Sequence, residues 1–144
     1  MADLTITAAS VLMSAAGKSV TGIAGAAITA GDALYKDAAD SNKLKLADAD
    51  GAAALRAVCG IALNDAAAGQ PVEYCISDSA LVIGGTVSIG YIAILSGVAG
   101  AICPAADAAA GDEVVIIGVG VSTTALKVNF VSPSPLRAGA VIPA

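Results

Sequence analysis

The sequence of 144 residues contains no histidine, few aromatic residues and few charges. Histidine is the usual general base of enzymes and the commonest zinc ligand, so its absence argues against most acid–base catalysis and most zinc sites. Aromatic residues make up 3% of the chain. Since each aromatic side chain buries roughly 150 to 250 Å², their scarcity predicts a thin core of Val, Ile and Leu, which contacts between subunits would complete.

The three cysteines are odd in number and have no CxxC spacing. This pattern indicates neither a zinc site nor a framework of disulfides, and we expect free thiols in a reducing compartment. We expect segments 57–63 and 72–77 to pair as a hairpin in which Ile61 faces Tyr74. This pairing puts Cys59 and Cys75 on opposite faces of the hairpin. We expect Cys59 to be buried as a small apolar residue and Cys75 to be more exposed.

Templates for catalysis and for cofactor binding fail on identifiable residues. Segment 86–90 approaches a nucleophile elbow, but Thr86 replaces the first glycine and no histidine is present to activate Ser88. Asp48 and Asp50 lack the further ligands and the closing Glu of a calcium loop. The glycine-rich pieces lack the spacings that bind phosphate. We therefore expect no enzyme activity and no metal or other cofactor.

The charge pattern bears on possible partners. The net charge is -5, and the seven basic residues are scattered. Phosphate binding needs clustered Lys and Arg, so we expect no nucleic acid as a direct partner. No charge occurs between Ser79 and Ala106, a length that could span a membrane as a helix. Its glycines and β-branched residues instead predict short strands and turns, and basic anchors are missing at its ends, so we expect no membrane partner.

Three blocks of the first half of the sequence recur in the second half in the same order. At offsets of 59, 58 and 54 residues, the matched blocks are 25–35 with 84–94, 58–63 with 116–121, and 72–76 with 126–130. The first two matches place Gly31 on Gly90 and Gly60 on Gly118. Three ordered matches indicate a duplicated β unit.

Apolar alternation predicts strands. Segments 72–76 and 126–130 alternate apolar and more polar residues, as half-buried strands do. The run 114–121 is apolar on both faces, which predicts a central strand or one covered by another subunit. We predict an all-β fold, a compact β-barrel or sandwich built from two similar β units.

Both ends of the chain differ from the middle. Residues 1–24 begin with a short alternating stretch, and residues 132–144 contain three prolines, which prevent continuous sheet pairing. We predict extended N- and C-terminal arms there, around a β-rich domain at 25–131 whose similar halves span about 25–78 and 84–131. The apolar arm residues are the candidate contacts with a partner or a neighbouring copy: Leu4, Ile6, Leu136, Val141 and Ile142.

A further signal lies in the segments AGAAITAGDALYKD, LKLADADG, CGIALNDAAAGQPVEYCI and IGGTVSIGYI. At these segments the chain resembles small decoration, or cement, proteins of tailed-bacteriophage capsids, over roughly residues 20–131. Cys59 stands where that family has a small or aliphatic residue, and the proline-rich C-terminus lies outside the pattern. The resemblance implies a β-barrel-like fold without catalysis. It also implies a structural virion protein that binds the major capsid protein and stabilises the capsid as a homotrimer.

Two other classes of protein stay open. One is another phage structural subunit, such as a head fibre base or a tail component, and the other, less favoured, is a small membrane protein of holin type. For the leading interpretation, we expect assembly in the host bacterial cytoplasm and a final place on the capsid exterior of the virion.

Overall fold

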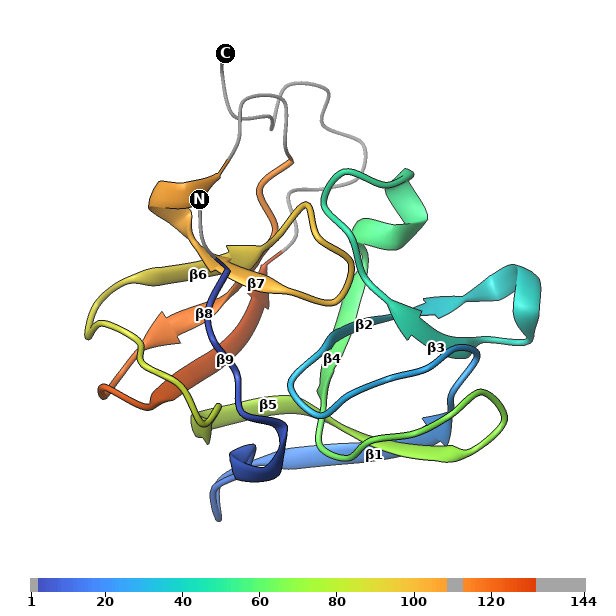
Figure 1. Cartoon of the computed structure of the whole chain (residues 1–144), viewed down its shortest axis with the longest axis horizontal. Helices are drawn as coiled ribbons and strands as arrows, with labels where there is room; N and C mark the ends of the chain where they lie inside the picture. The colour runs from blue at the N-terminus through green and yellow to red at the C-terminus, as the bar shows by residue number, and fades with distance from the viewer. Residues whose placement is uncertain (1–2, 109–112, 132–144) are drawn as a thin grey trace.

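The computed structural model describes residues 3–108 and 113–131, which form an all-β fold, as predicted (Figure 1). Strands and four 3-10 helices of three or four residues follow one another in these ranges. The strands are β1 (Lys18–Ile23), β2 (Ala33–Asp37), β3 (Lys43–Leu46), β4 (Val58–Ala62), β5 (Pro71–Val82), β6 (Ile92–Leu95), β7 (Ile102–Pro104), β8 (Ile116–Gly120) and β9 (Ala125–Val131). The 3-10 helices are η1 (Ala8–Ser10), η2 (Ala38–Asp40), η3 (Ala53–Arg56) and η4 (Ala105–Asp107).

One curled antiparallel sheet forms a half-barrel. Its strand order is β3-β2-β4-β5-β9-β8-β6-β7, and β1 pairs with β5 off this path. The order reads the same from both ends if β2, β3, β4 and β5 are matched with β6, β7, β8 and β9. Figure 1 shows the two groups of strands side by side, with the long β5 running beneath both. Duplication of one β unit explains this palindromic order.

The strand register repeats the internal match of the sequence. Three pairs between β2 and β4 have counterparts between β6 and β8 at the predicted offsets. They are Ala33–Ile61 with Ile92–Val119, Leu34–Gly60 with Ala93–Gly118, and Tyr35–Val58 with Ile94–Ile116. Both pairings shift register at the same place, so Cys59 in β4 and Ile117 in β8 occupy equivalent β-bulges.

Strand β5 belongs to both repeats. Its first part pairs with β1 and its last part pairs with β9. Gly22 opposite Val72 in the first pairing corresponds to Leu81 opposite Leu126 in the second, at offsets of 59 and 54. We therefore define a first unit, residues 18–77, and a second unit, residues 78–131. Residues 18–23, assigned from the sequence to the N-terminal arm, are the first strand of the repeat.

Two apolar cores stabilise the fold. The smaller core lies within the first unit and contains Ala24, Ile28, Leu34, Leu44, Ala62, Ala66, Val72 and Tyr74. The larger core joins both units and includes Ala33, Ile61, Cys75, Leu81, Leu95, Ile102, Ile117 and Leu126. Each buried Ile or Leu contributes about 1.5 to 3 kcal/mol relative to an exposed one. The sheet of the first unit is therefore buried on both faces.

Burial on both faces corrects two expectations. Cys75 is fully buried and Ile76 is 38% exposed, the reverse of the predicted alternation. Ile61 pairs with Cys75 rather than with Tyr74, a shift of one residue from the predicted register. The prediction assumed a single buried face, whereas Tyr74 faces the smaller core and Cys75 faces the larger one.

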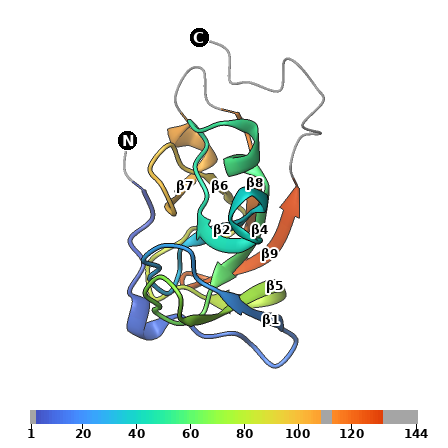
Figure 2. The ribbon, with the colours of Figure 1, turned by 90° about the vertical axis from the view of Figure 1, so that its right-hand side faces the viewer.

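The N-terminal segment, residues 3–17, lies along the molecule rather than away from it. Figure 2 shows its first part, up to η1, on the side of the molecule opposite to β9. Leu4 N donates to Ile102 O at 2.7 Å, and Leu12 and Val82 exchange two backbone hydrogen bonds of 2.9 and 3.0 Å. The C-terminal arm, residues 132–144, lies outside the described residues.

Candidate interaction surface

Five exposed apolar side chains lie on the second unit, where β6 and β8 meet the adjoining turns. Ile92 and Val119 are opposite each other in the two strands, with 43% and 36% of their surfaces exposed. Ile89 and Tyr91, in the turn before β6, are 69% and 59% exposed, and Val121 follows β8. We call these five residues the open face.

A glycine turn holds the open face in place. Gly90 has a φ of 81°, a left-handed conformation that favours glycine. Gly90 N donates to Gly120 O at 2.8 Å, and Gly120 N donates to Tyr91 O at 2.9 Å. These two bonds fasten the turn to the end of β8, so the backbone beneath the open face is fixed.

The first unit contains the same turn. Gly31 has a φ of 96°, Gly31 N donates to Ala62 O at 2.8 Å, and Ala62 N donates to Asp32 O at 2.9 Å. Residues equivalent to Ile92 and Val119 are Ala33 and Ile61, both fully buried. One backbone arrangement is therefore covered in the first unit and uncovered in the second.

Two segments of the chain itself cover the face of the first unit. A Cβ atom placed on Gly31 would meet the side chains of Ile6 and Val11 in the N-terminal segment. The turn between β6 and β7 covers the rest, since Ala33 N donates to Gly100 O at 2.9 Å. Apart from its chain neighbours, no described residue lies within 4 Å of a Cβ atom placed on Gly90. The difference between the units is thus one of cover.

Two hollows border the open face. A cavity of about 110 Å³ lies between Leu4, Val87, Tyr91, Ile92 and Leu126. A shallower depression of about 260 Å³ lies between Tyr91, Ile92 and Ala105. Tyr91 and Ile92 stand between them, so the surface alternates ridges and hollows, as apolar contact surfaces do.

The structure places two of the predicted contact residues, Leu4 and Ile6, on the chain's own core. Both side chains are half-buried against the larger core. The segment that carries them fits against Gly84 and Gly85, where a Cβ atom would collide with backbone atoms of Thr7 and Thr5. A contact of Leu4 or Ile6 with another protein stays a prediction. Leu136, Val141 and Ile142 lie outside the described residues.

Asp78 fastens the N-terminal segment at the junction of the two units. It is almost fully buried, and its carboxylate accepts hydrogen bonds from the hydroxyl and the backbone N–H of Ser14 and from Ala80 N. Burial raises the pKa of Asp78, but these hydrogen bonds outweigh burial and hold the pKa below its ordinary value. Asp78 is therefore an ionised anchor.

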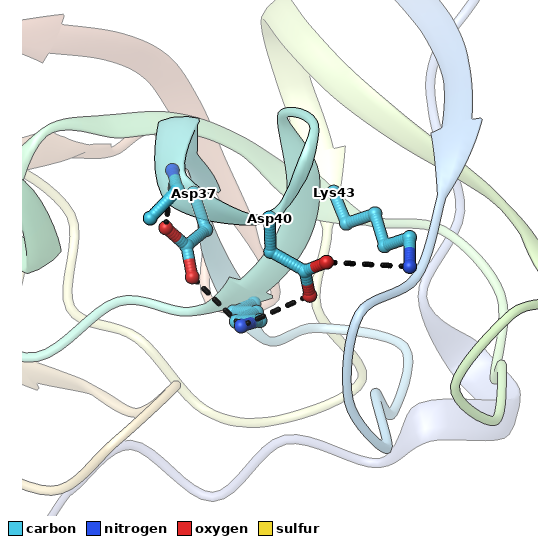
Figure 3. A network of polar contacts seen from close by, with 5 residues as sticks. Asp37, Asp40 and Lys43 are labelled. Atoms are coloured by element: carbon cyan, nitrogen blue, oxygen red, sulfur yellow. Dashed lines mark hydrogen bonds and ion pairs between the residues drawn. The ribbon is translucent and has the colours of Figure 1, made fainter.

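The turn between β2 and β3 carries a charged network (Figure 3). Lys45 Nζ lies 2.7 Å from Asp37 and 3.2 Å from Asp40, and Lys43 Nζ lies 3.3 Å from Asp40. Hydrogen bonds from Lys45 lower the pKa of Asp37 and Asp40, and the same bonds raise the pKa of Lys45. The equivalent turn of the second unit is uncharged and docks on the first unit, with Gly100 N donating to Ala47 O at 2.7 Å.

Cys59 and Cys75 are free thiols, as predicted. The prediction that Cys59 is buried and Cys75 exposed was wrong, since Cys59 is half-buried in its bulge and Cys75 is fully buried. Burial, with a smaller effect of the Asp78 carboxylate, raises the pKa of Cys75 to about 11. Burial also raises the pKa of Cys59, although Lys36 opposes this effect. Both groups are therefore weak nucleophiles near neutral pH.

The described part of the chain shows no clustered metal ligands and no long apolar helix. Among residues 3–108 and 113–131, no group of three or more His, Cys, Asp or Glu side chains is placed to hold a metal ion. Over the same ranges, no helix is both long and apolar enough to cross a membrane. The uncharged segment 79–106 contains the end of β5, then β6 and β7, with turns between them.

No model of a protein family matches the sequence, and no curated protein matches it.

The open face was not among the predicted contact residues. Its only sequence signal was the two-sided apolar run 114–121, which includes Val119 and predicted a strand that is central or covered by another subunit.

Proposed function

We propose that this chain is a structural virion protein that binds the outer surface of a bacteriophage capsid and stabilises it as a homotrimer. The segments that resemble capsid decoration proteins carry this proposal. They overlap the repeated unit: they contain the glycine turns at Gly31 and Gly90, strand β2, most of β3 and β4, and the first half of β5. The family-like residues are thus the ones that set the framework of both units.

The physical properties of the surface suit such a role. A protein that covers a shell gains from many weak contacts held at once, because multivalent attachment multiplies modest affinities. The chain supplies a rigid framework, an uncharged apolar face and an acidic remainder. Leu136, Val141 and Ile142 of the C-terminal arm are the predicted contacts with the major capsid protein, since an extended arm can add to a neighbour's sheet edge.

Co-sedimentation with capsids tests the proposal. Purified chain is mixed with capsids of the encoding phage that lack it, and bound protein is measured after pelleting, followed by the temperature at which the capsids break. We expect saturable binding and a higher breakage temperature. A full-length chain with Leu136→Ser, Val141→Ser and Ile142→Ser tests the predicted arm contact, and we expect weaker binding with an unchanged fold.

Two outcomes would contradict the proposal. Chain that stays in the supernatant at every concentration has no affinity for the capsid. Antibody labelling that marks tails or head fibres in micrographs of intact virions would assign the chain to another structural subunit. Leu4 is a poor first target in these experiments, because its backbone bond to Ile102 is part of the fold.

A further inference from the structure

We propose that the open face is a self-association surface and that neighbouring copies of this chain cover it with their own open faces. The inference deepens the proposed function, because it names the surface through which copies associate. It concerns the free chain in solution, so its test needs no capsid. Four observations support it.

The first observation is the covered counterpart within the same molecule. The backbone turn and the strand pair beneath the open face recur in the first unit, where Ile6, Val11 and Gly100 cover them. Such a face packs well against apolar atoms, since Ala33 and Ile61 are fully buried there. In the second unit no described residue other than the two chain neighbours of Gly90 lies within 4 Å of the Cβ position there.

The second observation is that three of the five uncovered residues are larger and more apolar than their covered counterparts. Ala30, Asp32 and Ala33 of the covered face are replaced by Ile89, Tyr91 and Ile92 on the open face. An outer surface in contact with water alone favours the opposite replacement, because exposed apolar area carries a hydration cost. Aromatic and aliphatic side chains grouped on one exposed surface are typical of protein contacts, with Tyr a frequent anchor.

The third observation is the distribution of charge. The chain has a net charge of -5, so two copies repel each other at most orientations. Residues 79–106, which contain three of the five open-face residues, have no charged side chain. Lys127 lies opposite Val119 in the pairing of β8 with β9, so the strand register places a basic residue beside the open face. Contact through the uncharged segment therefore avoids part of this repulsion.

The fourth observation favours the open face of another copy, as the occupant, over the turn between its β2 and β3. The turn that covers the first unit is the uncharged turn between β6 and β7, already used within each chain. Its free counterpart, between β2 and β3, carries the network of Asp37, Asp40 and Lys45. Placing that network on an apolar face would remove water from several charges, which is costly. Contact between open faces avoids this cost, and three open faces that meet around a three-fold axis give the closed homotrimer proposed above.

Sedimentation equilibrium on the full-length chain tests this inference. The wild-type chain is expected to form a discrete oligomer as its concentration rises. Tyr91→Ser combined with Ile89→Asp should raise the dissociation constant at least about tenfold, equivalent to about 1.4 kcal/mol. Both side chains are more than half exposed, so the substitutions remove no core packing. An unchanged far-ultraviolet spectrum and melting temperature, measured on dilute samples, confirm that the variant folds.

A matched control uses an apolar residue with the same exposure elsewhere. Val98, in the turn between β6 and β7, is 59% exposed, as is Tyr91. Val98→Thr should leave the dissociation constant unchanged. Equal weakening by Val98→Thr and by the open-face variant would overturn the inference, and so would a wild-type chain that stays monomeric at all concentrations.

The chain's own C-terminal arm is the competing occupant of the open face. Full-length chain with Leu136→Ser, Val141→Ser and Ile142→Ser separates the two cases. We expect its dissociation constant to match that of the wild type. If the arm covers the face instead, this variant will associate more strongly than the wild type, and the inference fails. Loss of capsid binding by a variant that still self-associates would concern only the proposed function.

Discussion

The two units share one hydrogen-bond framework but differ in surface. Equivalent glycine turns make equivalent bonds at 2.8 and 2.9 Å, and equivalent bulges interrupt β4 and β8. Residues 18–77 nevertheless carry twelve charged side chains, against five in residues 78–131. The face that is buried in the first unit is exposed in the second. Backbone register therefore persists through duplication, while the surface diverges according to what covers it.

Whether a neighbouring segment covers a position also determines how much its side chain contributes to stability. A side chain in the first unit contributes core packing, whereas its counterpart in the second contributes to stability only when another copy covers it. The following predictions compare equivalent positions, from the largest expected effect to the smallest, in dilute samples.

Ile61→Ala and Val119→Ala compare the same strand position in the two units. Ile61 is fully buried, so its truncation should lower the free energy of unfolding by about 2 to 5 kcal/mol. Val119 is 36% exposed, and its truncation should cost less than about 1 kcal/mol. Denaturant unfolding measures both values, and equal losses would show that the two positions are covered alike.

Gly31→Ala and Gly90→Ala compare the two turns. Both glycines have positive φ, which costs any other residue about 1 to 2 kcal/mol. Gly31→Ala should lower the free energy of unfolding by about 1 to 3 kcal/mol more, because the new methyl group meets Ile6 and Val11. Thermal unfolding of the two variants checks this order. A larger loss for Gly90→Ala would contradict the assignment of the covered face.

Asp78→Asn and Ser19→Ala compare the two first strands of the repeat, in which Asp78 and Ser19 are equivalent. Asp78 is buried and accepts charge-assisted hydrogen bonds, so its replacement should cost about 1 to 3 kcal/mol. The Ser19 hydroxyl donates a hydrogen bond to the exposed Glu73 at 2.6 Å. Its replacement should lower the free energy of unfolding by about 0.5 kcal/mol or less. Chemical unfolding at neutral pH gives both numbers.

Acid should remove the contribution of Asp78. Because its pKa is lower in the folded than in the unfolded chain, its stabilisation is complete above about pH 4 and is lost as the pH falls through the folded-state pKa. The stability difference between the wild type and Asp78→Asn should therefore narrow below about pH 4. A stability difference that stays constant down to about pH 2 would contradict ionisation of Asp78 in the folded chain.

Thiol reactivity should separate Cys59 from Cys75. A thiol with a pKa of about 11 is ionised to only about one part in a thousand at pH 8, and Cys75 is also fully buried. Cys59 is half-buried and should react first with a disulfide reagent in the native chain. Mass spectrometry after timed quenching identifies the modified residue. Reaction of Cys75 ahead of Cys59 would contradict the observed register of β4 and β5.

The sequence predicted the framework because glycine and strand periodicity are local signals. Gly31 and Gly90 mark the same left-handed turn, and the offsets of 59 and 58 correctly match the strand pairing of β2 with β4 to that of β6 with β8. The pairing of β4 with β5 could not be predicted in the same way. Both faces of that hairpin are buried, so alternation did not show which face of β5 points to which core.

The sequence could not predict which face of each unit is covered, because this depends on how the two units and the N-terminal segment dock. The small residues Gly84 and Gly85 permit the close approach of Thr5 and Thr7, but a pair of glycines does not name its partner. The exposure of Ile89 and Tyr91 follows from the same docking. The sequence could therefore predict that Val119 lies in a strand with two apolar faces, and not which face stays open.

The three tyrosines give the most direct test of the open face. Tyr35 and Tyr74 are buried in the first unit and Tyr91 is exposed in the second. Hydroxyl-radical footprinting is carried out from about 1 μM to about 1 mM protein, a range that spans dissociation free energies of about 8 to 4 kcal/mol. We predict that oxidation of Tyr91 falls as the concentration rises, while Tyr35 and Tyr74 stay protected throughout. Oxidation of Tyr91 that is independent of concentration would contradict the account.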